Sequence, residues 1–127
     1  MQMGRGRFSI LSAVALCLTV LSCSTKSNPV AGTTPDVIIS IKANSSQLGS
    51  RAYWPSPDTV LVGTKVAWKN NDSMAHTSTQ RTGAFTWDTG PISPGTRSVV
   101  VTMTAPGNYD YICTAMMHTM KGVLVVK

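Results

Sequence analysis

The chain contains few of the residues that build most metal and catalytic sites. It has two histidines, His76 and His118, and three cysteines among 127 residues. A multicopper oxidase or a copper nitrite reductase needs many more histidines than two. A cysteine hydrolase needs a base and an orienting group beside its nucleophile, and no motif here marks an oxyanion hole. We therefore expect that the protein is not an enzyme.

Long hydrophobic runs, helical periodicity and basic tracts are also missing. The main apolar run, residues 8–21, is shorter than the ~20 residues that a membrane-spanning helix needs. No segment repeats apolar residues at helical spacing for several turns, which argues against a helical protein. No basic stretch is interleaved with aromatic residues, so we expect no nucleic-acid partner.

The N-terminal segment has the order of an export signal. Arg5 and Arg7 precede the apolar run, and the small residue Ser22 follows it directly before Cys23. A basic start, a short apolar run and a small residue at the end indicate a signal peptide, which we place at residues 1–22.

The residues around Cys23 indicate a lipid anchor. The sequence Val20-Leu21-Ser22-Cys23 resembles a bacterial lipobox, in which the cysteine is acylated and becomes the mature N-terminus. Ordinary cleavage near Ser22, which would leave a soluble protein, is the alternative. We expect an exported lipoprotein, periplasmic or on the cell surface, whose Cys23 lipid anchors it to a membrane.

The rest of the chain divides into a tether and one domain. Residues 23–36 hold the lipidated cysteine and a stretch rich in Ser, Thr, Pro and Gly, a composition typical of flexible linkers. Residues 37–127 are enough for one domain but not for two. Within that domain Cys113 is the only cysteine, so no disulfide can support the fold and a binuclear copper-A centre, which needs two cysteines, is excluded.

Short apolar runs separated by Gly, Pro and Asn predict strands throughout this domain. Apolar and polar residues alternate in the clearest runs, which is the pattern of half-buried strands, and several such strands predict an antiparallel β-sandwich. We expect Trp68, Tyr109 and Tyr111 in its core, whereas the turn-rich surroundings of Trp54 and Trp87 leave core and surface both open. The predicted strands are Val37–Ile41, Lys65–Lys69, Ser98–Thr104, Tyr109–Cys113 and Val123–Val126.

Both histidines and the domain's cysteine lie near predicted strand ends. His76 follows the turn after Lys65–Lys69, Cys113 ends a strand, and His118 lies in the loop before the last strand. In a sandwich these strand ends can meet at one pole. Two imidazoles and a thiolate in a near-trigonal plane, with a weak axial thioether, form a blue-copper site. The three residues therefore predict a site for one copper ion that cycles between Cu(I) and Cu(II).

Methionines supply candidates for the axial position. Five remain beyond the predicted signal peptide, and four of them lie within four residues of a proposed ligand. Methionine is also a common filler of apolar cores, so position in the sequence alone does not select one. The four are Met74, Met116, Met117 and Met120.

Three stretches of the domain resemble the plastocyanin-type cupredoxins. They are VAWKNNDSMAHT, GAFTWDTGPISPGTRSVVVTMTAPGNYDYIC and HTMKGVLVV, and the resemblance covers roughly residues 60–127. That family is a Greek-key β-sandwich that carries single electrons between redox partners. The resemblance implies that His76, Cys113 and His118 are the equatorial ligands and that Met120 is the axial ligand.

Two positions depart from the common pattern of that family. Only Thr119 separates His118 from Met120, whereas more residues usually stand there, so Met116 or Met117 remains an alternative axial ligand. Thr77 follows His76 where many members have Asn. That neighbour often forms hydrogen bonds near the cysteine sulfur, so redox tuning should differ in this chain.

These features predict a monomeric one-electron carrier with transient redox protein partners. The apolar residues beside His118 would form the docking patch, because electron-transfer contacts are small. The alternative is a copper carrier or buffer that delivers the ion to a cuproenzyme. Clusters of Met and His, which soft Cu(I) favours, support that alternative.

Overall fold

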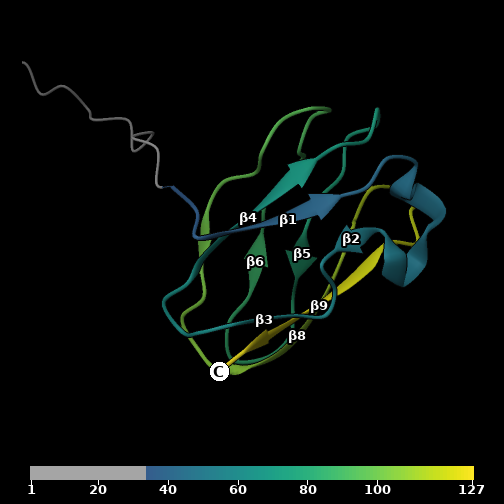
Figure 1. Ribbon diagram of the computed structural model, residues 1–127. Helices are drawn as coiled ribbons and strands as arrows, with labels where there is room; N and C mark the ends of the chain where they lie inside the picture. The colour runs from purple at the N-terminus through teal and green to yellow at the C-terminus, as the bar shows by residue number, and fades with distance from the viewer. Residues whose placement is uncertain (1–33) are drawn as a thin grey trace, which may run out of the picture. The chain divides into compact units, whose positions relative to one another are not determined.

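The computed structural model of the protein describes residues 34–127 (Figure 1). The predicted signal peptide, Cys23 and all but the last residues of the predicted tether lie outside the described residues. Within residues 34–127 no helix is long and apolar enough to cross a membrane. The elements are β1 (Val37–Ile41), η1 (Ser45–Gln47), η2 (Gly49–Arg51), β2 (Tyr53–Trp54), β3 (Asp58–Val60), β4 (Lys65–Asn70), β5 (Thr79–Gln80), β6 (Trp87–Asp88), β7 (Val101–Thr102), β8 (Gly107–Ile112) and β9 (Lys121–Val126).

The strands form two sheets, which confirms the predicted all-β sandwich. One sheet has the order β2-β1-β4-β7 and the other has the order β3-β9-β8-β5-β6. Most neighbouring strands are antiparallel, but β1 pairs with β4 and β3 pairs with β9 in parallel. The sheets are therefore mixed rather than purely antiparallel, because the chain crosses between the sheets before it returns beside β1 and beside β3.

Strand alternation places one face of each long strand in the core. In β8 and the residue after it, Tyr109, Tyr111 and Cys113 are buried while their neighbours are more exposed, as their spacing predicts. Trp68 of β4 is fully buried and meets Tyr111 edge-to-face across the two sheets, with ring centroids 5.6 Å apart. These contacts hold the two sheets face to face.

Trp54 and Trp87, for which the sequence allows either core or surface, have different environments. Trp87 is buried and stacks on Trp68 with ring centroids 5.7 Å apart. Trp54 is exposed, and the ammonium group of Lys42 lies 5.0 Å from its ring centroid. The aromatic core therefore contains one more tryptophan than the sequence pattern alone established.

The predicted strand Ser98–Thr104 is shorter in the structure. Only Val101–Thr102 pairs regularly, with Val66 and Lys65 of β4. Before it, Ser98 uses its hydroxyl to accept a hydrogen bond from the N–H of Trp68, 2.9 Å away. The Ser98 N–H still donates to the Trp68 carbonyl at 2.8 Å, so the hydroxyl replaces one of the two backbone hydrogen bonds that a regular antiparallel pair exchanges.

Candidate metal centre

The three predicted equatorial residues come from two strand ends and one loop. His76 follows β4 and forms an isolated bridge with Ile92, in which the two residues exchange backbone hydrogen bonds of 3.2 and 2.7 Å. Cys113 directly follows β8, and His118 lies in the loop between β8 and β9. Pairing of β5 with β8 brings the segment after His76 beside the end of β8.

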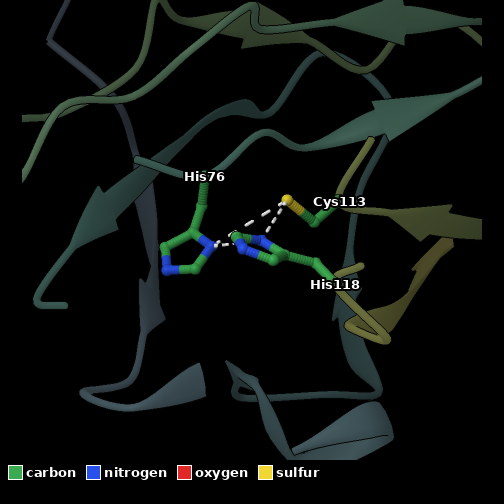
Figure 2. A group of neighbouring side chains, drawn as sticks. All are labelled: His76, Cys113 and His118. Carbon is green, nitrogen blue, oxygen red and sulfur yellow. Dashed lines mark hydrogen bonds between the residues drawn. The ribbon is translucent and has the colours of Figure 1, made fainter. Parts of the chain in front are cut away.

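The structure brings these three side chains together (Figure 2). His76 Nδ1 lies 3.2 Å from His118 Nδ1, and Cys113 Sγ lies 3.4 Å from His118 Nδ1 and 3.9 Å from His76 Nδ1. Two nitrogens about 2.0 Å and a sulfur about 2.3 Å from one ion, spread trigonally, lie roughly 3.5 to 3.8 Å apart. The donor set and its spacing therefore fit one metal ion that favours thiolate and imidazole ligands.

Burial protects most of this cluster from water. His76 is 1% exposed and Cys113 is 4% exposed, whereas the His118 side chain is partly exposed. Among the described residues Cys113 is the only cysteine and forms no disulfide. A buried thiol that faces two imidazoles is typical of a metal ligand rather than of an apolar core residue.

The turn before His76 is fixed by Asn70 at the end of β4. The Asn70 amide nitrogen donates hydrogen bonds to the carbonyls of Met74 at 2.7 Å and Ile92 at 2.8 Å. Its side-chain oxygen accepts a hydrogen bond of 2.8 Å from the N–H of Asp72. One buried amide therefore closes the turn and ties it to the segment that pairs with His76.

Thr77 connects the segment of His76 to the segment of Cys113. The Thr77 N–H points to Cys113 Sγ at 3.3 Å, and the Thr77 hydroxyl accepts a hydrogen bond of 2.8 Å from the N–H of Thr114. Tyr53 holds the backbone of the same residue, because its hydroxyl donates to the Thr77 carbonyl at 2.5 Å. The residue after His76 thus contacts the cysteine sulfur, as the family resemblance implies for this position.

The loop that carries His118 is attached to η1. The N–H of Thr119 donates to the Ser46 carbonyl at 2.8 Å, and the Gln47 amide donates to the Met117 carbonyl at 2.8 Å. Within the loop, the N–H of His118 donates to the Ala115 carbonyl at 3.2 Å. These bonds hold the His118 loop against a segment far earlier in the chain, since Gln47 and Met117 are 70 residues apart.

The candidate axial methionines separate clearly by burial. Met120 is 1% exposed, and the Ser45 hydroxyl contacts its sulfur at 3.6 Å. Met116 and Met117 are 89% and 87% exposed, so their side chains lie at the surface. The same Ser45 hydroxyl contacts His76 Nε2 at 3.2 Å, so it touches both the Met120 sulfur and the His76 ring. Of these three methionines, Met120 alone has a buried side chain, and its assignment as the axial ligand stays a prediction.

Two groups near the cluster have shifted pKa values. Burial of Asp72 by itself would raise the pKa of its carboxyl, but hydrogen bonds from His76 and from the N–H groups of Asn44, Ser45 and Ser73 hold that pKa well below its usual range. Burial lowers the pKa of His118, and the neighbouring His76 ring lowers it further against an opposing effect of Asp72. The shift favours a neutral His118, which is the form that binds a metal.

The sequence prediction missed Asp72 and Ser45 as parts of the site. Asp72 belongs to the turn that the sequence predicts after Lys65–Lys69, and its carboxylate lies 2.8 Å from His76 Nε2. The signal available in the sequence was an acidic residue four positions before His76. Ser45 carried no such signal, because it meets His76 across 31 residues of chain.

Comparison with known proteins gives a family match and many similar folds. Residues 40–127 match the family described as copper binding proteins, plastocyanin/azurin family. A comparison with curated protein sequences finds no match.

Several copper proteins share the fold. The purple cupredoxin from Nitrosopumilus maritimus is 24% identical with a TM-score of 0.62, over 72% of this chain and 100% of that one, and shows the fold alone. An oxidized amicyanin mutant is 26% identical with a TM-score of 0.57, over 72% of this chain and 81% of that one. The Cu-containing nitrite reductase from Thermus scotoductus SA-01 is 25% identical with a TM-score of 0.58, over 74% of this chain but only 22% of the enzyme.

The family match covers most of the described domain and contains every residue of the His-Cys-His cluster. The similar solved structures have the same fold, and the donor atoms are of the types that copper prefers. The chain therefore belongs to the plastocyanin/azurin family of copper-binding proteins, with His76, Cys113 and His118 positioned to bind one copper ion.

Proposed function

We propose that the protein transfers single electrons through one type 1 copper centre formed by His76, Cys113, His118 and, as the axial ligand, Met120. The observation that carries this proposal is the convergence of His76 Nδ1, His118 Nδ1 and Cys113 Sγ within 4.8 Å of one another. The bound copper supplies the one-electron redox change. The proposal assigns the protein no catalysis on a small-molecule substrate.

In this proposal the protein fold holds the copper ligands in fixed positions. Cu(I) and Cu(II) favour different geometries, so a site that holds an intermediate arrangement limits the rearrangement that each electron transfer requires. The Thr77 carbonyl accepts a hydrogen bond from Tyr53 and the Thr77 N–H contacts Cys113, while η1 holds the His118 loop. These hydrogen bonds join all three equatorial ligands to the sandwich, which supports a rigid centre.

The proposed electron path leaves the protein through His118. This histidine is partly exposed, whereas His76 and Cys113 are buried. Met116 and Met117 precede it in the same loop and expose 89% and 87% of their surface. We assign these apolar side chains to a docking patch for transient redox partners, since small contacts allow fast dissociation.

The proposed location rests on the N-terminal sequence. A signal peptide at residues 1–22 and a lipidated Cys23 would place the domain outside the cytoplasm, at the periplasmic side of a membrane or on the cell surface. Cys23→Ser should then move the protein from the membrane fraction to the soluble fraction. An unchanged distribution would contradict the anchor but not the copper centre.

An equilibrium redox titration of the copper-loaded protein tests the electron-transfer role. We expect a reversible transition of one electron per protein with no loss of copper over repeated cycles. The physical reason is that the same buried, hydrogen-bonded ligands hold both oxidation states. Loss of the ion on reduction, or the absence of a reversible transition, would contradict the proposal.

A second candidate is the copper carrier, and the exposed methionines favour it. Met116, Met117 and the 49% exposed Met74 place thioethers, which are ligands suited to Cu(I), at the surface beside the cluster. A carrier should release Cu(I) to a soluble chelator within seconds to minutes, whereas an electron carrier should retain it. The chelator competition therefore separates the two candidates in one experiment.

A further inference from the structure

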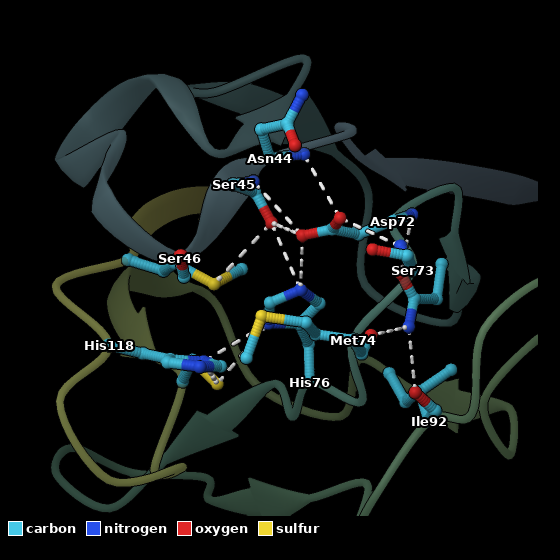
Figure 3. A network of polar contacts seen from close by, with 12 residues as sticks. Asn44, Ser45, Ser46, Asp72, Ser73, Met74, His76, Ile92 and His118 are labelled. Carbon is cyan, nitrogen blue, oxygen red and sulfur yellow. Dashed lines mark hydrogen bonds and ion pairs between the residues drawn. The ribbon is translucent and has the colours of Figure 1, made fainter.

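The ring nitrogen of His76 that points away from Cys113 has a carboxylate partner. His76 Nδ1 faces the other two ligand atoms, and His76 Nε2 lies 2.8 Å from Asp72 Oδ2. Both residues are buried, with Asp72 6% exposed and His76 1% exposed. In the described part of the chain this is the only contact between a carboxylate and a basic side chain within 4.0 Å. Figure 3 shows the carboxylate between the His76 ring and the backbone of Asn44 and Ser45.

The Asp72 carboxylate is itself held by several donors. Oδ1 accepts hydrogen bonds from the N–H groups of Asn44 at 3.0 Å and Ser73 at 2.7 Å. Oδ2 accepts from the N–H of Ser45 at 3.0 Å and from its hydroxyl at 3.3 Å. Asn44 has the left-handed values φ 57 and ψ 34, and this conformation turns two successive N–H groups toward one anion. The carboxylate therefore cannot rotate away from His76 without losing these bonds.

This arrangement decides which nitrogen of His76 carries the proton. An ionised carboxylate only accepts hydrogen bonds, so the 2.8 Å contact requires a proton on His76 Nε2. A neutral ring protonated on Nε2 has its free electron pair on Nδ1, the atom that faces Cys113 and His118. The carboxylate also draws the Nε2 proton and thereby increases the basicity of Nδ1.

We propose that Asp72 is a positioning residue of the copper centre, which fixes His76 as the Nε2–H tautomer and stabilises Cu(II) relative to Cu(I) through that ring. This inference rests on the proposed copper site. The Asp72 carboxylate contacts none of the three cluster-facing atoms directly and acts through the His76 ring. Negative charge and added basicity at Nδ1 favour the more highly charged ion. Removal of the carboxylate should therefore raise the reduction potential.

The decisive variant is Asp72→Asn, which keeps the shape of the side chain and removes its charge. We expect the Cu(II) dissociation constant to increase roughly 10- to 100-fold, the range typical of lost partners of metal-binding histidines. The Cu(I) dissociation constant should change less. Each tenfold loss of Cu(II) affinity relative to Cu(I) raises the potential of a one-electron couple by about 59 mV.

Asp36→Asn is the matched control, because it removes the same charge from a carboxylate that also accepts a backbone hydrogen bond, from Lys65 at 2.9 Å. Asp36 precedes β1 at one end. The other end of β1 lies beside the turn that contains Asp72, because the Ile41 carbonyl accepts a hydrogen bond from the N–H of Asn71. The five residues of β1 span about 16 Å, beyond the screening length of about 8 Å at physiological salt. If Asp72→Asn and Asp36→Asn have the same potential, or if Asp72→Asn lowers it, the proposal is wrong.

A second measurement needs no variant and does not depend on correct folding of Asp72→Asn. Long-range ¹H–¹⁵N NMR spectra of histidine rings report the tautomer in the copper-free protein and in the diamagnetic Cu(I) protein. We expect a proton on His76 Nε2 that exchanges slowly with water in both forms. A proton on Nδ1 in the copper-free protein, or copper bound through Nε2, would overturn the inference. Because the copper-free spectrum involves no redox chemistry, its outcome is separate from that of the electron-transfer proposal.

Discussion

At the scale of single residues, the methionines show how burial distinguishes chemically identical candidates. Met120 is buried beside the Ser45 hydroxyl, while Met116 and Met117 are almost fully exposed. The sequence placed all of them near His118, and only the side-chain directions in the folded loop separate them. Packing therefore separates the three methionines where spacing in the sequence does not, and the axial role of Met120 stays a proposal.

Met120→Leu tests the axial assignment. The substitution nearly conserves volume, so we expect a loss of less than about 1.5 kcal/mol in the free energy of unfolding. Loss of a thioether that donates weakly to copper should raise the reduction potential and change the visible spectrum. Redox titration and absorption spectroscopy of the copper-loaded variant measure both effects.

Met116→Leu and Met117→Leu are the controls for this test, since both side chains are exposed. They should leave the spectrum and the potential unchanged. A spectral change in either control with none in Met120→Leu would show that the axial position is assigned to the wrong methionine.

Thr77 has a different role, because its hydroxyl joins the two ligand segments. Thr77→Ala removes the acceptor for the N–H of Thr114 and should cost about 0.5 to 1.5 kcal/mol of stability. It should also shift the thiolate-to-copper absorption band, because Thr77 donates its N–H to Cys113 Sγ and its hydroxyl holds the residue after Cys113. Thermal unfolding and visible spectra measure the two effects, and Thr77→Ser, which keeps the hydroxyl, should restore most of both. Equal effects in Ala and Ser would refute a role for the hydroxyl.

At the scale of elements, the sequence pattern predicted the long strands well and the short ones poorly. Val37–Ile41 forms β1 with the predicted bounds, and the predictions for β4, β8 and β9 are correct to within two residues at every end. The two-residue strands β2, β5 and β6 were not predicted, because two residues carry no alternation. In the structure β2 and β6 pair with the preceding strands β1 and β5, whereas β5 also pairs with β8 much later in the chain.

The same distinction applies to the metal centre. The cluster of His76, Cys113 and His118 could be predicted, because copper chemistry restricts the residue types and because all three lie near the ends of predicted strands. The contacts of Ser45 with Asp72 and with His76 could not, since the position of η1 over the cluster depends on tertiary packing. Long-range hydrogen bonds of this kind leave no local pattern in the sequence.

Pairing of β8 with β9 depends on a close approach at Gly122. A Cβ atom added at Gly122 would overlap the ring of Tyr111, the facing residue of β8. We expect Gly122→Ala to cost about 1 to 3 kcal/mol in the free energy of unfolding, because the aromatic ring must move within a packed core. Denaturant unfolding of the copper-free protein measures this cost.

A double-mutant cycle provides the control for this prediction. Tyr111→Leu removes the ring atoms that the new Cβ would meet, so adding Gly122→Ala to it should cost much less than in the wild-type chain. If the two costs simply add, Gly122 is required for a reason other than contact with Tyr111.

At the scale of the whole molecule, copper binding and folding are coupled, because the ligands lie on separate elements that only the folded sandwich brings together. At a free copper concentration of 100 times the dissociation constant, binding should stabilise the fold by about 2.7 kcal/mol. For a domain of this size, that corresponds to a rise in Tm of roughly 10 to 20 °C. Thermal unfolding with and without copper measures the rise.

Cys113→Ala is the reference for that measurement, since it removes the thiolate and leaves the two histidines. Its Tm should respond to copper far less than that of the wild-type protein. An equal response of both proteins would locate the stabilising copper elsewhere. The monomeric state and the lipid anchor are also properties of the whole molecule, and both stay predictions.

The most direct test of the copper centre is titration of the copper-free protein with Cu(II), followed by visible absorption and EPR. The structure predicts saturation at one equivalent, an intense thiolate-to-copper band and a narrow copper hyperfine splitting, with both signals absent in Cys113→Ser. A colourless complex, or a band that persists in Cys113→Ser, would contradict a type 1 centre formed by His76, Cys113 and His118.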